Sequence, residues 1–323
     1  MKRETTKALK TLRKSTGNKL GLVILATVIA VSLAFTLLDK WGGIYDTLGL
    51  SGAGLNNAFG GQRSGEGVSV HFIDVGQGDC ALIITPENSV LIDSGERDYY
   101  STVVNYIRAR GVGKLDYIIA THPHSDHIGG IGNIIDELGA DMIIMPEIPE
   151  ELTPTTSGYI RMLDSIYNNS VEAIYAKPGM KFDLGNSQME IIAPVGNYDN
   201  LNDYSVVMRF TYENHSFLFT GDIEAAVESD IVDSGDITAE VLSVSHHGSR
   251  TSSTAKFLNA VGGNYAVISV GSPNSYNHPD DRVLNRLLDR NYEILRTDLH
   301  GNIVFDCGGE ALEVYVQKGG QAA

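Results

Sequence analysis

Hydrophobic residues recur in two different periods from Val68 onward, and these periods predict an alternation of strands and helices. The first three β-rich runs are followed by helical spacing at 100–110 and 130–138, which alternates with buried strands at 115–120 and 141–145. The opening runs predict a meander of three strands. They occupy 68–75, 80–85 and 89–94.

The second half of the chain continues the alternation and ends in a hairpin predicted around His300–Gly301. We expect helices at 156–168, 253–260 and 280–289. We expect strands at 171–175, 188–193, 205–212, 215–220, 240–245 and 264–270. Two β-rich halves with helices outside predict an α/β fold, a four-layer αβ/βα sandwich.

An uncharged, largely apolar segment, 20–38, precedes this region. Its 19 residues, at about 1.5 Å each, nearly cover a hydrocarbon core of about 30 Å and predict a transmembrane helix. Seven Lys and Arg side chains within 1–19 keep the N-terminus cytoplasmic. A cleavable signal peptide fits less well, since its apolar region is usually about 7–15 residues long with a small-residue cleavage site. A buried core helix is the third interpretation.

The chain therefore divides into four predicted parts: a basic cytoplasmic segment (1–19), a transmembrane helix (20–38), a Gly-rich linker (39–67) and a folded domain (68–323). We expect a single-pass protein of the cell membrane whose main domain is extracytoplasmic.

Charge restricts the partners of that domain. The chain has 24 Lys and Arg against 40 Asp and Glu, and beyond residue 19 there are 17 basic and 39 acidic side chains, a net charge of −22. Non-specific binding of nucleic acid by a general electrostatic surface is disfavoured, because it depends on basic side chains that neutralise phosphates. An anionic substrate would need a local cationic centre.

The segment THPHSDH (121–127) follows a predicted strand and concentrates four candidate metal ligands. Alternate residues of extended backbone share a face, so His122 and His124 can bind one ion while Asp126 and His127 turn toward a second. Imidazole and carboxylate ligands suit Zn²⁺, Mn²⁺ or Fe. A polar surface loop would not need such a concentration of histidine.

This His-x-His-x-Asp-His pattern resembles the signature of the metallo-β-lactamase fold superfamily, and the resemblance extends over 68–316. It implies that Asp93 orients a ligand histidine from outside the metal site. It also implies that Asp222 bridges two divalent ions (Zn or Mn) and that His246 is the last ligand, with His247 close by.

Three segments further resemble the hydrolase domain of ComEC-type competence proteins: DVGQGD (74–79), SHHGS (245–249) and NHP (277–279). That domain is similar to a nuclease domain thought to degrade the DNA strand that is not imported. A related branch includes surface phosphorylcholine esterases that act on teichoic acids. The resemblance implies a phosphodiesterase, with Asp74, Asp79 and Ser249 in contact with the metal ligands or the substrate.

The sequence departs from the superfamily at the third histidine ligand, expected near the strand that follows Gly196. The chain reads NDYSVV (202–207) there, and the competence-type subgroup has a similar Asn- and Ser-rich segment. The first ion is left one imidazole short. Asn202, Asp203 or water could complete its shell, with Ser205 nearby, and oxygen ligands would favour Mn²⁺ or Mg²⁺ over Zn²⁺.

Several residues have both a functional and a structural interpretation. His278 precedes a predicted helix, where N–H groups favour anions, so it could contact phosphate, donate a proton or cap the helix. His247 could do the same or exchange roles with His246. Ser249 and Ser252 could contact substrate or cap loops. His71, His215 and His300 are expected to be structural or exposed.

Two remaining features complete the sequence picture. GQGDCA (76–81) formally matches a dinucleotide-binding fingerprint, but the residues after it predict a strand instead of the required helix, so no nucleotide cofactor is expected. Cys80 and Cys307 are the only two cysteines and could form one disulfide or remain buried thiols.

Two divalent ions balanced by two aspartates would leave a positive centre that attracts a phosphodiester. We therefore expect a membrane-anchored phosphodiesterase or nuclease acting on DNA, with Asp126, Asp222 and His278 as catalytic residues. The alternatives are a teichoic-acid phosphorylcholine esterase, a β-lactamase and a non-catalytic metal-binding surface module. One predicted transmembrane helix cannot form a DNA channel, and the sequence identifies no protein partner.

Overall fold

The computed structural model describes residues 67–318. The predicted basic segment, the transmembrane helix and the linker up to residue 66 lie outside these residues. Among the helices within 67–318, none combines the length and the apolar character that crossing a membrane requires.

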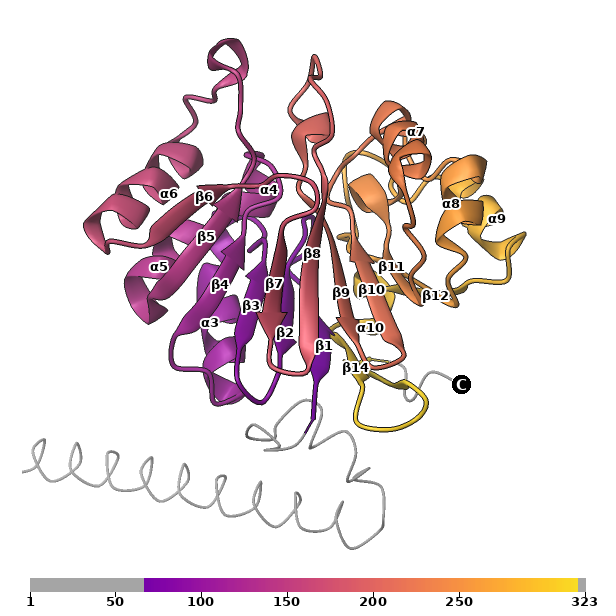
Figure 1. Cartoon of the computed structure of the whole chain (residues 1–323), viewed down its shortest axis with the longest axis horizontal. Coiled ribbons are helices and arrows are strands. Elements are labelled where there is room, and N and C mark those ends of the chain that lie inside the picture. Colours follow the sequence, from indigo (N-terminus) through magenta and orange to yellow (C-terminus); the bar gives the residue numbers. More distant parts are fainter. Residues whose placement is uncertain (1–66, 319–323) are drawn as a thin grey trace, which may run out of the picture. The chain divides into compact units, whose positions relative to one another are not determined.

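Two mixed sheets form the framework of the described domain (Figure 1). The first has the order β15-β14-β1-β2-β3-β4-β5-β6 and the second the order β13-β12-β11-β10-β9-β8-β7. The strands of the first sheet are β1 (Ser69–Phe72), β2 (Ala81–Ile84), β3 (Ser89–Ile92), β4 (Leu115–Ile119), β5 (Ala140–Met145), β6 (Glu172–Tyr175), β14 (Ile303–Asp306) and β15 (Glu313–Val316). Those of the second are β7 (Lys181–Leu184), β8 (Ser187–Ala193), β9 (Val207–Tyr212), β10 (His215–Phe219), β11 (Val241–Ser243), β12 (Tyr265–Ile268) and β13 (Glu293–Arg296).

Helices cover the outer face of each sheet (Figure 1). Beside the first sheet lie α3 (Tyr100–Ala109), α4 (Ser125–Ile128), α5 (Ile131–Leu138) and α6 (Ser157–Asn168). Beside the second lie α7 (Ala225–Ser234), α8 (Ala255–Val261) and α9 (Asp281–Leu288), and the short α10 (Thr297–His300) follows β13.

Three hydrophobic clusters fill the spaces between these layers. Because a sheet packs against a cluster on each side, its central strands are apolar on both faces. In β2 every residue is buried, because Ala81 and Ile83 face the other sheet while Leu82 and Ile84 face the helices. Phe72 and Phe219 stack across the space between the sheets. The predicted four-layer αβ/βα sandwich is confirmed, as is the opening meander of β1, β2 and β3.

The predicted terminal hairpin around His300–Gly301 is wrong. The strands on either side of that position belong to different sheets, since β13 pairs in parallel with β12 and β14 pairs antiparallel with β1. The short helix α10 carries the chain from one sheet to the other and ends at Gly301, whose φ of +66° suits glycine. The terminal hairpin is formed by β14 and β15. β7, α7 and β15 had no counterpart among the predicted elements.

The two cysteines remain free, buried thiols. Cys80 packs with the helices outside the first sheet, whereas Cys307 packs between the sheets. The structure therefore favours two buried thiols over one disulfide.

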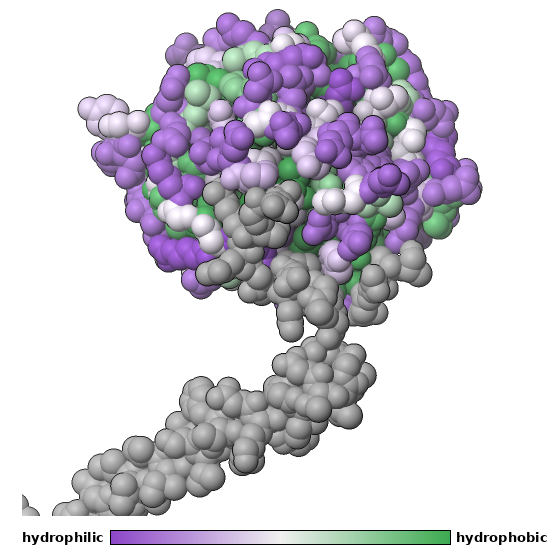
Figure 2. All heavy atoms as spheres, turned by 60° about the horizontal axis from the view of Figure 1, so that its bottom comes forward, coloured by the Kyte–Doolittle hydropathy of each residue, from purple (hydrophilic) through white to green (hydrophobic). Residues whose placement is uncertain are grey.

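Several strands end at one edge of the sandwich, where the predicted ligands follow them. Asp93 follows β3 and residues 121–127 follow β4, and these strands are parallel. On the second sheet, Asp222 follows β10 and the His246–His247 pair follows β11, which are also parallel. The Val206 N–H donates to Thr121 O at 2.9 Å, so the two sheets meet at this edge. The face seen in Figure 2 is mostly hydrophilic, with hydrophobic side chains scattered over it.

Candidate metal centre

The segment 121–127 combines a bend at His122 with a helical turn, where extended backbone was expected from His122 to His124. Residues 121–124 are not helical, and Asp126 and His127 lie in the first turn of α4. The structure brings the ligand atoms of His122 and His124 within 4.8 Å of each other and of Asp222. It brings those of Asp126, His127 and His247 together in the same way. The composition of the two clusters is consistent with a pair of ion positions.

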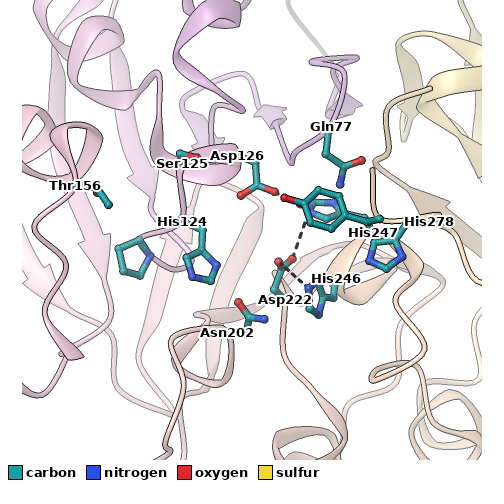
Figure 3. Close-up of a pocket in the computed structure, with 12 residues that line it drawn as sticks. Gln77, His124, Ser125, Asp126, Thr156, Asn202, Asp222, His246, His247 and His278 are labelled. Carbon is teal, nitrogen blue, oxygen red and sulfur yellow. Dashed lines mark ion pairs between the residues drawn. The ribbon is translucent and has the colours of Figure 1, made fainter. Parts of the chain in front are cut away.

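Asp222 lies between the two clusters and turns one carboxylate oxygen toward each. Its Oδ2 is 3.7 Å from His122 Nε2 and 3.8 Å from His246 Nε2. Its Oδ1 is 3.2 Å from His127 Nε2 and 3.8 Å from His247 Nε2. Figure 3 shows Asp222 among the labelled side chains, with its ion pairs to His246 and His247 drawn as dashed lines. This is the position a bridging carboxylate needs.

The backbone around Asp222 is fixed by its neighbours. The Asp222 N–H donates to Ser205 Oγ at 3.1 Å. Gly221 has a φ of +51°, and a Cβ there would lie 2.9 Å from Ser205 Oγ and 3.0 Å from Thr121 Cβ. Ser205, predicted to lie beside the site, therefore positions the central carboxylate.

Asp93 contacts His127 on the side of the ring that faces away from Asp222. The His127 Nδ1–H donates to Asp93 Oδ2 at 2.8 Å, and Thr121 donates to the same carboxylate from its backbone N–H and its hydroxyl. Asp93 is fully buried, and burial raises its pKa while His127 opposes the rise. This hydrogen bond leaves Nε2 of His127 free to face Asp222.

His246 and His247 follow β11 in two successive left-handed backbone conformations, with φ of 54° and 53°. Each costs a non-glycine residue roughly 1–2 kcal/mol, a strain typical of functional sites. The result is that the two rings take different environments. His247 is buried, and its Nε2 lies 3.3 Å from Asp126 Oδ2. Its Nδ1–H donates to Ser269 O at 2.9 Å, and Nδ1 also lies 3.3 Å from Asp79 Oδ1.

His247, and not His246, therefore stands beside Asp126 and His127, whereas the family resemblance implies His246 as the last ligand with His247 close by. Both histidines line the cavity, and His246 Nδ1 is 3.6 Å from Glu224 Oε1. The alternative that the two histidines exchange roles matches this geometry. Nothing in the residue types of SHHGS indicates two successive left-handed residues. The sequence therefore could not show which of the two histidines faces Asp126 and His127.

The protonation of the centre follows from burial and charge. Burial lowers the pKa of His122 well below its usual value, which keeps this imidazole neutral and able to bind a metal. Burial alone would also lower the pKa of His247, but the nearby Asp222, Asp126 and Asp79 raise it to about 10. Burial opposes ionisation of Asp222, yet His127 and His247 hold its pKa well below the ordinary value.

Three polar atoms in and beside the cluster of Asp126, His127 and His247 lack a hydrogen-bond partner among the described residues. They are His127 Nε2, Asp222 Oδ1 and His247 Nε2. All three are buried, and an unpaired buried polar atom costs about 1–3 kcal/mol. Asn202 Oδ1, which belongs to a residue lining the same cavity, is likewise buried without a partner in this part of the chain. Nitrogen and oxygen donors in this arrangement fit divalent ions.

A cavity of about 370 Å³ opens over the two clusters. His124, Asp126 and Asp222 contribute to its lining, and Figure 3 shows Gln77 and His278 beside His247. Gln77, Thr156 and Tyr276 were missed by the sequence analysis. Of these three residues, only Gln77 lies within a motif that pointed to the site, DVGQGD.

The remaining predicted residues have other contacts. Asp74 accepts hydrogen bonds from the Gly76 N–H and Lys318 Nζ, and it is not part of the cavity lining. Ser249 bonds with the Thr251 hydroxyl, which is a loop contact. His278 is not the cap of α9, because Asp280 accepts the capping hydrogen bond from the Arg282 N–H.

Comparisons with known proteins agree with this geometry. The sequence model described as "Metallo-beta-lactamase superfamily" matches residues 73–272. ComE operon protein 3 of Bacillus subtilis is 28% identical over 268 residues, 75% of this chain and 33% of that protein. Competence protein ComA of Neisseria gonorrhoeae is 33% identical over 242 residues, 73% of this chain and 32% of that protein.

The chain thus spans about a third of the length of these curated relatives. Among solved structures, CmlA, a diiron beta-hydroxylase from Streptomyces venezuelae, is similar with a TM-score of 0.50 and 12% identity. The match covers 74% of this chain and 54% of that one. This likeness concerns the fold alone.

Proposed function

Because the chain belongs to the metallo-β-lactamase superfamily and carries a buried His/Asp centre suited to metal, we propose that it is a two-metal phosphodiesterase that cleaves DNA. The observation that carries the proposal is the position of Asp222, whose two oxygens face two separate ligand clusters. A single structural zinc needs only four ligands. This centre offers more donors than that, which argues against the non-catalytic surface module.

We assign the second ion position to Asp126, His127, His247 and Asp222 Oδ1. The first position takes His122, His124 and Asp222 Oδ2, and the missing third histidine is replaced by His246 Nε2, with Asn202 Oδ1 at its side. Two observations support His246 over water. His246 Nε2 lies 3.8 Å from Asp222 Oδ2, and His122 Nε2 lies 3.7 Å from the same oxygen. Glu224 lies against its other ring nitrogen, as carboxylates do behind metal-bound histidines.

Two divalent ions held here would lower the pKa of a water molecule and neutralise the phosphoryl oxygens of a bound diester. The residues of the chain supply the remaining requirements. Asp222 and Asp126 contribute two negative charges and the imidazoles are neutral. The charge of two divalent ions would exceed these two negative charges, so the loaded centre would be positive. Asp93 fixes the orientation of His127. His278 lines the cavity with a buried Nδ1 that lacks a hydrogen-bond partner within 67–318, and we assign to it the protonation of the leaving oxygen.

DNA is favoured because a relative that matches 73% of the chain is named as a competence protein. The acidic surface supports a second candidate, the phosphorylcholine ester carried by teichoic acid of the cell envelope, because the choline cation offsets the negative charge of its own phosphate. A net charge of −22 beyond residue 19 repels a long polyanion everywhere except at the metal centre. We also propose that residues 20–38 anchor the chain in the cell membrane with the domain outside.

The test uses the purified chain, stripped of metal and reloaded with Mn²⁺ or Zn²⁺. Labelled single- and double-stranded DNA and p-nitrophenyl phosphorylcholine are offered separately. The doubly substituted Asp126→Ala, His127→Ala protein should lose activity, whereas Asp164→Ala, at an exposed carboxylate of α6, should retain it. Metal-dependent cutting of DNA that the double variant loses supports the proposal. Hydrolysis of the choline ester alone would shift the substrate to the envelope.

A further inference from the structure

The rim of the cavity carries an aromatic stack that the metal centre does not explain. The rings of Tyr276 and His278 are stacked with centroids 5.7 Å apart and planes inclined by 19°. Both residues line the cavity. Tyr276 is 62% exposed, although one face of its ring is covered by His278. The other face is therefore available to a ligand.

Asn274 holds this stack in place. Its side-chain amide donates to the carbonyl oxygens of Gly271 and His278, both at 2.8 Å. Its Oδ1 accepts from the backbone N–H groups of Tyr276 at 3.1 Å and of His278 at 3.0 Å. One side chain thus makes four hydrogen bonds within the loop. An exposed aromatic ring on a loop fixed in this way is preorganised, so little conformational entropy is lost when it binds.

The stack is connected to the metal centre by a short series of rings. His246, which lies 3.8 Å from Asp222, is in edge contact with His278, with ring centroids 5.9 Å apart. Tyr276 is the next ring outward. A group that extends from a phosphate bound at the two clusters would pass His246 and His278 before reaching Tyr276. In a nucleotide, a sugar separates phosphate from base in the same manner.

The number of aromatic rings favours a flat ligand over a quaternary ammonium group. Choline-type cations are bound by cages in which several aromatic faces surround the charge. Tyr276 is the one Tyr, Phe or Trp among the described residues that line this cavity. A single free ring face instead suits a planar partner, and nucleobases stack on such faces with about 1–3 kcal/mol per base.

We propose that Tyr276 is a stacking platform for the nucleobase next to the scissile phosphate, so that the site takes single-stranded nucleic acid one unpaired base at a time. This inference rests on the proposed phosphodiesterase function and specifies its substrate. In duplex DNA the bases are stacked on each other, so the platform favours single strands or ends. The proposed role is one of positioning, because the ring would contact the base and not the scissile phosphate.

The experiment compares an oligonucleotide that carries a base at the tested position with one that is abasic there, using the Mn²⁺-loaded full chain. Wild-type protein should cut the abasic strand with kcat/KM lower by about 5- to 150-fold, the range that loss of one stacked base gives. Tyr276→Ala should cut both strands at that lower value. Tyr276→Phe, which keeps the ring, should discriminate like wild type. Tyr167→Ala, at a tyrosine of α6 that is 85% exposed, is the matched control.

The outcomes separate this inference from the proposed function. Equal cutting of both strands by wild type overturns the platform while leaving the phosphodiesterase intact. The same holds if Tyr276→Ala lowers cutting of both strands equally, because the tyrosine would then serve only the loop. Failure of the metal-loaded wild type to cut any DNA contradicts the proposed function itself and removes the basis of this inference.

Discussion

The His127 Nδ1–H donates a hydrogen bond of 2.8 Å to the Asp93 carboxylate, which lies on the side of the ring away from Asp222. The Asp93 carboxylate also accepts two hydrogen bonds from Thr121, the first residue of the THPHSDH segment. The residue that follows β3 thus fixes the tautomer of a candidate ligand on α4, the helix that follows β4. The sandwich holds its metal centre through such contacts between neighbouring strand ends.

Replacing this carboxylate should weaken metal binding without unfolding the chain. In Asp93→Asn the amide keeps the size of the side chain but provides a weaker acceptor for His127. We expect metal affinity at the second position to fall about 10- to 100-fold, the usual effect of losing such a partner. Calorimetric titration with Mn²⁺ measures it. Asp116→Asn, at a β4 carboxylate that accepts hydrogen bonds from Ser89, is the control, and equal affinities for both variants would contradict the role of Asp93.

The two adjacent histidines should have separable effects on metal stoichiometry. We expect His247→Ala to remove the ion of the second position and His246→Ala to weaken the ion of the first, so each variant should retain about one tightly bound ion. Elemental analysis after dialysis counts the ions. The assignment of His246 fails if His246→Ala still binds two ions with the wild-type affinities, and Asn202→Ala would then be the variant to titrate.

The sequence itself allowed part of the centre to be predicted because four candidate ligands are local, whereas Asp222 and the His246–His247 pair were expected only from the family resemblance. His122, His124, Asp126 and His127 lie on one strand end and one helical turn, so periodicity alone divides them between two ions. The order of His246 and His247 could not be predicted, because it depends on two left-handed residues whose strain the surrounding structure maintains.

The errors in the fold have a similar origin. The segment of α7 has few apolar positions, of which Val227 and Ile231 are buried, so its helical period is weak. The hairpin expected around His300–Gly301 failed because strand pairing is a long-range property. β13 and β14 are consecutive in the chain but pair with strands of different sheets. Nothing in their composition indicates which sheet each one joins.

His71 should make the domain sensitive to acid. Its ring bonds to Ser69 and Tyr106, and burial, aided by Arg110, lowers its pKa to about 3. Between pH 6.5 and 3 the unfolded chain binds a proton that the folded chain excludes. The free energy of unfolding should therefore fall as pH falls, by at most about 1.4 kcal/mol per pH unit from this group.

Denaturant unfolding of the metal-free protein at pH 6.5 and pH 5 tests this contribution. His71→Gln does not titrate, so its loss of stability over this interval should be smaller than that of wild type by about 1–2 kcal/mol. His300→Gln, at a half-buried histidine, is the control. Equal losses in wild type and His71→Gln would show that His71 titrates alike in both states.

Both thiols should be unreactive in the folded chain. Cys80 and Cys307 are each 1% exposed, and burial raises the pKa of both. A thiolate-specific reagent should label neither in native buffer and both after unfolding in guanidinium without reductant. Absence of labelling after unfolding would mean that the two cysteines form a disulfide.

The central claim is that two ions, shared by Asp222, are both required for phosphodiester cleavage. The most direct measurement titrates the metal-free chain with Mn²⁺ while cleavage of a labelled single-stranded oligonucleotide and bound metal are followed in the same samples. We predict that activity rises mainly with the second equivalent and that Asp222→Asn, which has lost the shared carboxylate, stays inactive at every concentration. Full activity at one equivalent, or none after two ions are bound, would contradict the two-metal account.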